Sequence, residues 1–206
     1  FFVMLLSMSS MDRERMISVS SFLRGAVGVL EGGIRGPVKT PKVVAQKARV
    51  GNSLVFEVNQ SLTALGLTAG QGADVGTGVS VVEQGDDVLI TLQDVVLFQG
   101  GSAQLSDPPP EVLRVIARVL KKYPFAIRVL GHADRGGEGS ERKALRLSLQ
   151  RALSVVNYLQ VREGIAEGRL TAAGFGAMHP VGSNLTEAGR ARNRRVEIAV
   201  VVSPRG

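Results

Sequence analysis

The chain contains no cysteine and only two histidines, His132 and His179, among its 206 residues. Without cysteine it cannot form a disulfide, a thiolate nucleophile or a cysteine-ligated metal site. Two histidines would need carboxylate ligands to complete a zinc site, so we expect no metal and no cofactor. The lack of cysteine does not identify a redox compartment, because proteins of oxidising and of reducing compartments can both lack cysteine.

The sequence also lacks an evident catalytic centre. His132 is close in sequence to Asp134 and Ser140, but catalysis needs a nucleophile, a base and an orienting group that converge, and no such set is indicated. The glycine-rich segment 174–182 does not have the strand-to-helix context of a phosphate-binding loop. We therefore expect a protein that is not an enzyme, in which His132 supports its own loop.

Aromatic residues make up only 4% of the chain, and tryptophan is absent. The net charge is nevertheless +7, of which residues 131–206 contribute +5, from 12 basic against 7 acidic side chains. This balance favours an anionic partner, such as nucleic acid, a membrane surface or the carboxylate-rich peptides of a bacterial wall. Because the few aromatic residues are scattered and do not alternate with the arginines, the pattern argues against nucleic acid.

The apolar run at residues 1–11 is too short to span a bilayer, since a transmembrane helix needs about 20 apolar residues. Because the sequence begins with Phe and not with an initiator Met, we expect residues 1–11 to be part of a truncated transmembrane helix. A signal-peptide remnant is the alternative interpretation. It is weakened because no small-x-small cleavage site follows the run at a suitable distance.

Residues 12–33 begin with the charged segment DRER and continue with apolar residues at steps of three and four, which predicts an amphipathic helix. Residues 34–78 are expected to form a linker and a further helix. The linker begins in the glycine- and proline-rich sequence GGIRGPVKTPK of residues 32–42. The further helix is predicted by one apolar stripe, which consists of Val50, Leu54, Val58, Leu62 and Leu65. Gly66 would end this helix. The stripe is expected to form either a lid on the next domain or a dimer seam.

Residues 79–203 are expected to form a folded domain. Runs at 79–82 and 88–92 predict a β-hairpin. A helix is predicted after Asp107, which stands where an N-cap is expected, and a strand is predicted at 125–130. A second helix follows from the apolar residues Leu145, Leu149, Ala152, Val156 and Leu159, which leaves Arg151 on a polar or boundary face.

The last part of the domain predicts a strand at 169–173, a short helix at 186–192 and a strand at 196–202. The order is strand, helix, strand, helix, strand, strand. Helices interspersed with strands indicate an α+β fold, a two-layer sandwich with both helices on one face of the sheet.

Four sequence motifs carry a family resemblance: GHADRGG from residue 131, LSLQRA from 147, GFG from 174 and NRRVEIAVVV from 193. In their order and spacing these motifs resemble the OmpA-like peptidoglycan-binding domain, over roughly residues 86–203. The resemblance implies that the chain binds the diaminopimelate of a peptidoglycan stem peptide. Asp134 would accept the ammonium, Arg151 would bind the carboxylate, and Arg194 would also contact the ligand.

Other interpretations of these residues remain open. Asp134 could instead cap the next helix or pair with Arg135, and Arg151 and Arg194 could be solvated surface charges. Asn193 is expected to bond to the backbone, and Arg195 to be structural. The motifs also depart from the family pattern, with Ala133 in place of the usual Thr, Ala144 in place of the usual Asn, and two additional residues between Asp134 and LSLQRA.

The segments before the domain resemble the MotB family of flagellar stator subunits. This resemblance implies a single-pass inner-membrane protein with its C-terminal domain in the periplasm, a MotA-like channel subunit as partner, a homodimer, and a plug at residues 16–31. The ion-carrying acid of that family would lie upstream of residue 1. The alternative is an outer-membrane or periplasmic cell-wall tether of the OmpA family that is not linked to motility.

Overall fold

The structure is a computed structural model that describes residues 42–67, 78–85, 87–135 and 141–202. The expected transmembrane segment (1–11) and the plug-like helix (12–33) lie outside the described residues. In the part of the chain that is described, no helix has both the length and the apolar composition to cross a membrane.

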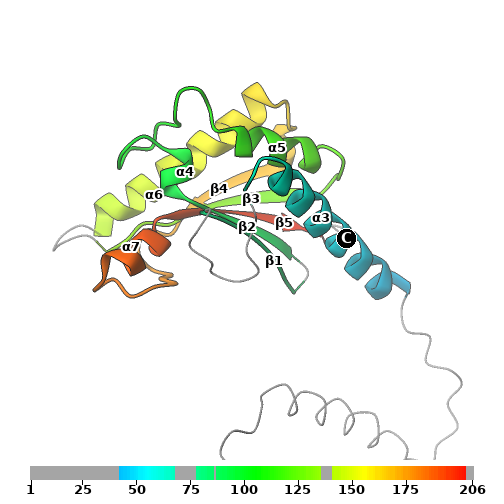
Figure 1. The fold of residues 1–206 in the computed structure, drawn as a ribbon, viewed down its shortest axis with the longest axis horizontal. Coiled ribbons are helices and arrows are strands. Elements are labelled where there is room, and N and C mark those ends of the chain that lie inside the picture. The colour runs from blue at the N-terminus through cyan, green and yellow to red at the C-terminus, as the bar shows by residue number, and fades with distance from the viewer. Residues whose placement is uncertain (1–41, 68–77, 86, 136–140, 203–206) are drawn as a thin grey trace, which may run out of the picture. The chain divides into compact units, whose positions relative to one another are not determined.

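The main elements are one sheet and two covering helices (Figure 1). The strands are β1 (Val79–Gln84), β2 (Asp87–Gln93), β3 (Ala126–Gly131), β4 (Leu170–Gly174) and β5 (Arg195–Val201). The principal helices are α3 (Lys42–Ala64), α5 (Glu111–Leu120) and α6 (Glu141–Asn157). Shorter helices are α4 (Asp94–Leu97), the π-helical turn η2 (Tyr158–Arg162), the 3₁₀ turn η3 (Glu167–Arg169) and α7 (Glu187–Asn193).

The strand order in the sheet is β1-β2-β5-β3-β4. Strands β3 and β4 are parallel, as a crossover through α6 requires, and the other neighbours are antiparallel. From β2 onward the sequence β2-α5-β3-α6-β4-β5 is the predicted one, and β1 pairs with β2 as the predicted hairpin. The α+β two-layer prediction is confirmed, with α5 and α6 on the same face of the sheet (Figure 1).

The covered face of the sheet supplies most of the hydrophobic core. Alternate residues of the three central strands are fully buried there: Val88, Ile90, Leu92, Ile127, Val129, Val196, Ile198 and Val200. Helix α5 meets them with Leu113, Ile116 and Leu120, which have no exposed surface. The period of two in the strands and of three to four in the helix places each set on one face.

The start of α5 differs from the prediction. The helix begins at Glu111, and Pro110 occupies the N-cap position without a side-chain hydrogen bond. Asp107 is therefore not the cap. Three consecutive prolines separate it from the helix, and proline has no backbone N–H for a cap to accept from.

The buried face of α6 also differs from the prediction. Leu145 and Leu149 are 44% and 40% exposed, whereas the buried residues of the helix are Ala144, Ser148, Arg151, Ala152 and Val155. A Cβ on Gly131 would lie 1.9 Å from the Ser148 carbonyl oxygen, and one on Gly174 would lie 2.5 Å from the Leu149 nitrogen. These glycines bring the helix so close to β3 and β4 that small side chains fill the contact and the leucines turn outward.

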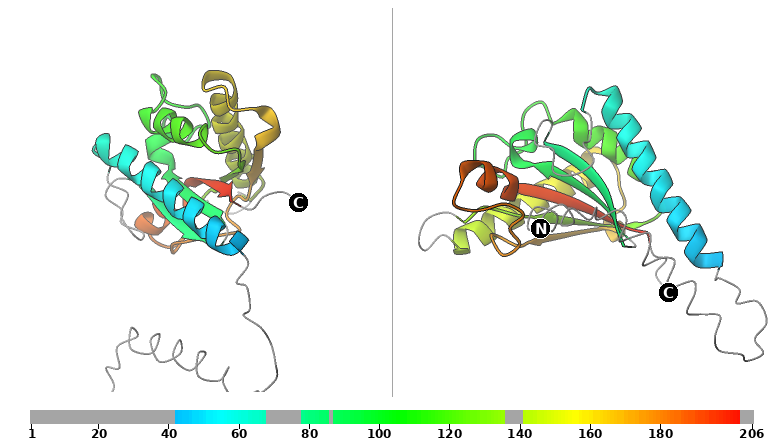
Figure 2. Two further views of the ribbon diagram at one scale, coloured as in Figure 1. Left: turned by 90° about the vertical axis from the view of Figure 1, so that its right-hand side faces the viewer. Right: turned by 60° about the horizontal axis from the view of Figure 1, so that its bottom comes forward.

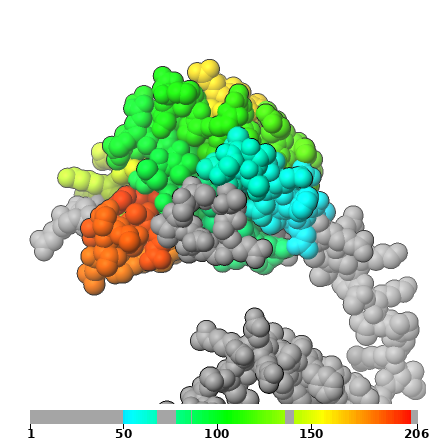
Figure 3. All heavy atoms as spheres, viewed as in Figure 1, coloured from blue at the N-terminus to red at the C-terminus, as the bar shows by residue number. Residues whose placement is uncertain are grey.

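Helix α3 packs against β1, β2 and α5. Its stripe residues Leu54, Val58 and Leu62 are fully buried, and Gly66, at φ +74°, follows the end of the helix as predicted. Glu57 of α3 also accepts hydrogen bonds from Tyr123 Oη (2.9 Å) and Lys122 Nζ (2.7 Å), which follow α5. Figure 2 shows α3 (blue to cyan) against the green part of the domain, and Figure 3 shows cyan atoms packed beside green ones, so the lid interpretation is favoured over a dimer seam.

Candidate functional site

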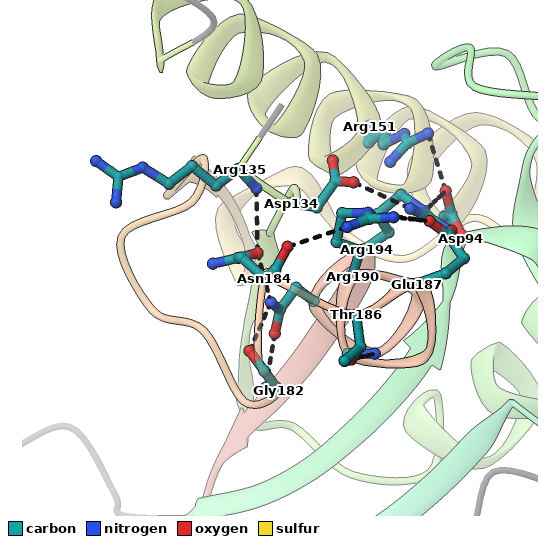
Figure 4. A network of polar contacts seen from close by, with 12 residues as sticks. Asp94, Asp134, Arg135, Arg151, Gly182, Asn184, Thr186, Glu187, Arg190 and Arg194 are labelled. Carbon is teal, nitrogen blue, oxygen red and sulfur yellow. Dashed lines mark hydrogen bonds and ion pairs between the residues drawn. The ribbon is translucent and has the colours of Figure 1, made fainter. Parts of the chain in front are cut away.

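Four chain segments meet at one end of the sheet. Gln93, the last residue of β2, pairs with Arg195, the first of β5, and Gly131, the last of β3, pairs with Val196. Asp94 therefore lies beside Arg194, and the loop that follows β3 brings Asp134 to the same place. Helix α6 contributes Arg151 from above this end of the sheet (Figure 4).

Arg194 is the centre of an ion-pair network. Its Nη1 donates to Asp134 Oδ2 at 3.0 Å, its Nη2 donates to Glu187 Oε1 at 2.8 Å, and its Nε is 3.6 Å from Asp94 Oδ2. Glu187 in turn accepts from Arg190 Nε at 2.9 Å. All three nitrogen groups of the Arg194 guanidinium thus face carboxylates, so its orientation is tightly fixed.

Arg151 is almost fully buried, with 1% of its surface exposed. Its Nε donates to the Ser102 carbonyl at 3.0 Å, its Nη2 is 3.2 Å from Asp94 Oδ2, and its guanidinium carbon lies 5.2 Å from the centre of the Phe98 ring. Its Nη1 is buried and has no hydrogen-bond partner among the described residues. The expectation that Arg151 projects from a polar or boundary face, and the alternative of a solvated surface charge, are both wrong, because the close approach of α6 turns this side chain inward.

Asp94 connects the predicted residues. Its Oδ2 is within ion-pair distance of both Arg151 and Arg194, and Arg194 holds Asp134, so Asp134, Arg151 and Arg194 belong to one network. Among the described contacts Asp134 and Arg151 have no direct ion pair. Sequence reasoning missed Asp94, although an acidic residue two positions after the strand predicted at 88–92 was a usable signal.

Burial lowers the pKa of Arg151 from its ordinary value, and the Asp94 carboxylate acts in the opposite direction. For Arg194, burial also acts to lower the pKa, but the hydrogen bonds to Glu187 and Asp134 outweigh it and leave the pKa raised. Arginine keeps its charge in proteins, so both side chains present fixed positive charges at this end of the sheet.

Two of the alternatives, an Asp134–Arg135 pair and a solvated Arg194, are not what the structure contains. Arg135 points away from Asp134 and lies 3.8 Å from Glu141, both side chains being largely exposed (Figure 4). Asp134 pairs instead with Arg194, which is 27% exposed and therefore not a freely solvated charge.

Asn193 binds the backbone, as predicted. Its Oδ1 accepts from the N–H groups of Val181 and Gly182, both at 2.8 Å. Arg195 is 4% exposed and donates to Glu197 Oε1 at 2.7 Å and to the His179 carbonyl at 3.2 Å, which fits the predicted structural role.

His132, in the loop that follows β3, is buried. Its ring is stacked on Phe175 with centroids 5.5 Å apart, and its Nε2 lies 3.2 Å from Glu197 Oε2 in an alignment that does not make a hydrogen bond. Burial raises the pKa of Glu197, but the contacts with His132 and Arg195 outweigh burial and hold that pKa at about 2. These contacts support the loop, as expected of His132.

The network balances three carboxylates against three guanidinium groups: Asp94, Asp134 and Glu187 against Arg151, Arg190 and Arg194. A ligand with one positive and one negative group adds no net charge to such a site. A divalent cation would fit poorly, and no group of three or more metal-binding side chains occurs in the described part of the chain.

Residues 97–194 match the sequence pattern of the OmpA family. The probable lipoprotein YiaD of Escherichia coli K12 is 40% identical over 126 residues, covering 61% of this chain and 56% of YiaD. The peptidoglycan-binding protein ArfA of Mycobacterium tuberculosis H37Rv is 35% identical over 133 residues, covering 64% of this chain and 37% of ArfA. The chain thus spans little more than half of YiaD and about a third of ArfA.

Solved structures share the fold. The cell wall anchor of the T6SS from Pseudomonas aeruginosa has a TM-score of 0.59 at 31% identity, covering 73% of this chain and 97% of that one. The periplasmic domain of Helicobacter pylori MotB has a TM-score of 0.54 at 26% identity, covering 61% of this chain and 90% of that one. The sequence match, the relatives and the common fold together show that this chain belongs to the OmpA family.

Proposed function

We propose that the chain binds peptidoglycan non-covalently, by holding the zwitterionic end of diaminopimelate between Asp134 and Arg151. The observation that carries the proposal is the buried Arg151 Nη1, which has no partner among the described residues. A buried donor without an acceptor is costly, so an unpaired one at a charged site points to a ligand acceptor. The carboxylate of diaminopimelate supplies that acceptor.

Asp134 receives the ammonium. Its Oδ2 is used by Arg194 and its side chain is 25% exposed. Its other carboxylate oxygen has no hydrogen-bond or ion-pair partner among the described residues, and in this proposal it accepts from the ammonium. Because Arg194 is held by three carboxylates, its main role in this proposal is to fix Asp134. A contact between Arg194 and the ligand carboxylate would have to compete with Glu187 or Asp94.

The relatives support this ligand. ArfA is named as a peptidoglycan-binding protein, and the structure of 31% identity is a cell wall anchor. The role assigned to this chain is that of a binding protein and not of an enzyme.

Co-sedimentation with purified diaminopimelate-containing sacculi tests the proposal. Asp134→Asn and Arg151→Gln should each reduce the bound fraction at least tenfold. Arg128→Ala is the matched control, because Arg128 lies on β3, is 50% exposed and pairs with Asp87 away from the network. Equal retention of the two site variants and the wild type would reject the pocket.

At a finer level we propose that this binding anchors an inner-membrane, ion-driven stator of the MotB kind, with a MotA-like channel subunit and a second copy of the chain. The proposal is supported by the MotB resemblance of the residues before the domain and by the similarity to Helicobacter pylori MotB. Deleting residues 16–31 in a strain that also carries the channel subunit should then slow growth through proton leakage. Unchanged growth would count against a plug.

A second candidate is a cell-wall tether for a machine other than the flagellum. The specific observation in its favour is the cell wall anchor of the T6SS, which shares more identity and a higher TM-score with this chain than does Helicobacter pylori MotB. Swimming speed after deletion of the chain distinguishes the two, because only a stator subunit is needed for flagellar rotation.

A further inference from the structure

A second surface, with both arginines and apolar side chains, adjoins the network on the side of Asp134 that faces away from Arg151. It is a pocket of about 550 Å³ between the start of α6 and the loop that follows β4. This volume is within the range of about 300–1,000 Å³ that is usual for small-ligand sites. Its lining includes Arg135, Arg142, Leu145, Phe175, Met178 and Asn184.

The pocket and the network are neighbours along the backbone. Arg135 directly follows Asp134, and its N–H donates to Asn184 Oδ1 at 3.2 Å. The same Oδ1 accepts from Asn193 Nδ2 at 2.8 Å, next to Arg194. Figure 4 shows the Arg135 side chain extending away from the Asp134–Arg194 pair, and this side chain is part of the pocket lining. Arg135 and Asn184 line the pocket, so it begins one residue from Asp134.

The arginine side chains of the pocket are only weakly ion-paired within the protein. Arg135 and Glu141 are 3.8 Å apart and 69% and 81% exposed, so their pairing contributes little and is readily exchanged for another carboxylate. Arg142 also lines the pocket and is exposed, and no acidic side chain of the described residues pairs with it. With two arginines and one glutamate, the pocket lining has a net positive charge.

The floor of the pocket is apolar and its position is fixed. Phe175 lies against the rings of His132 and His179, with centroids 5.5 and 5.0 Å away. Leu145 and Met178 stay 44% and 63% exposed on the pocket side. Exposed apolar carbon beside arginines suits a short aliphatic chain that ends in a carboxylate.

We propose that this pocket receives the residue that precedes diaminopimelate in the stem peptide, and that it selects the form with a free α-carboxylate. This residue is a glutamate linked through its side-chain carboxyl group, so its α-carboxylate is either free or, in amidated walls, a neutral amide. Arg142, with Arg135, binds the free carboxylate, and the apolar floor contacts the methylene groups. The inference rests on the proposed function, because it needs diaminopimelate in the network.

Calorimetric titration of the full chain with three soluble ligands tests the inference. The ligands are free diaminopimelate, the tripeptide Ala-γ-Glu-diaminopimelate, and the same tripeptide with its α-carboxylate amidated. The wild type should bind the carboxylate tripeptide three- to tenfold more tightly than the amide. The preference should shrink at high salt, since exposed charges are screened.

Arg142→Gln should reduce the preference to less than twofold and leave the affinity for free diaminopimelate unchanged. Arg146→Gln is the control, because Arg146 is exposed one turn further along α6 and is not part of the lining, and it should keep the preference. Arg135→Gln serves as a second variant that should weaken the preference.

Two results would overturn the inference while leaving the proposed function intact: equal affinity of the wild type for the two tripeptides, or a preference that survives in Arg142→Gln. If the wild type binds none of the three ligands, the proposed function itself fails and this inference fails with it. At least tenfold weaker binding to Asp134→Asn supports the proposed function, and a preference that is lost in Arg142→Gln but kept in Arg146→Gln supports the inference.

Discussion

Arg151 Nη2 lies 3.2 Å from Asp94 Oδ2, and this pair joins a nearly fully buried guanidinium to an acid at the start of a four-residue helix. The Arg151 charge is therefore compensated inside the protein before any ligand arrives. The same carboxylate faces Arg194, so one acidic side chain positions both arginines of the network.

Replacing Asp94 with Asn should lower the free energy of unfolding by about 3 kcal/mol, because removal of one partner leaves a buried charge without compensation. Urea unfolding measures the change. The matched control is Asp87→Asn, whose partner Arg128 is half exposed, and this change should cost about 1 kcal/mol or less. If the two substitutions have the same effect, Arg151 does not depend on Asp94.

Gly131→Ala should destabilise the fold by about 3 kcal/mol or more, since overpacking against backbone cannot be relieved by a rotamer change. The added Cβ would meet the Ser148 carbonyl oxygen at 1.9 Å. Thermal unfolding measures the loss. Gly168→Ala is the control, because a Cβ there meets nothing within 4 Å, and a similar loss at Gly168 would contradict the close approach of α6.

Leu54→Ala should lower the free energy of unfolding by about 2–5 kcal/mol, because this side chain is fully buried where α3 packs against the rest of the domain. Phe56→Ala, at a residue that is 66% exposed on the same helix, should have a small effect. Unfolding is followed at several protein concentrations. If α3 were a dimer seam and not a lid, the midpoint for the wild type would rise with concentration and Phe56 would matter as much as Leu54.

Glu197 should make the fold sensitive to acid. Its pKa of about 2 in the folded state is below the ordinary value of 4.5, so its contribution to stability is complete above pH 4.5 and is lost as the pH falls toward 2. A shift of this size corresponds to roughly 3 kcal/mol as an order of magnitude. The slope of unfolding free energy against pH between 4.5 and 2 should be smaller in Glu197→Gln. An unchanged slope would show that other carboxylates account for the acid sensitivity.

Much of the fold could be predicted because its signals are local. The alternation Val196, Ile198, Val200 gives β5, and the short helix predicted at 186–192 is α7, whose N-cap Thr186 accepts through Oγ1 from the Gly189 N–H at 3.1 Å. The orientation of α6 could not be predicted from its own residues, because two glycines on other strands, Gly131 and Gly174, decide which side meets the sheet.

The site was predictable in part for the same reason. Asp134, Arg151 and Arg194 lie in motifs of recognisable spacing, and they meet in one network. Asp94 belongs to none of the motifs and acts only through the pairing of β2 with β5, a long-range contact that sequence spacing does not reveal.

The most direct test of the account is a calorimetric titration of free diaminopimelate into the wild type, Asp134→Asn and Arg128→Ala. If Asp134 and Arg151 hold diaminopimelate, the wild type and Arg128→Ala should show saturable binding with the same affinity, and Asp134→Asn should bind at least tenfold more weakly. Binding of equal strength to all three proteins, or no binding to the wild type, would contradict it.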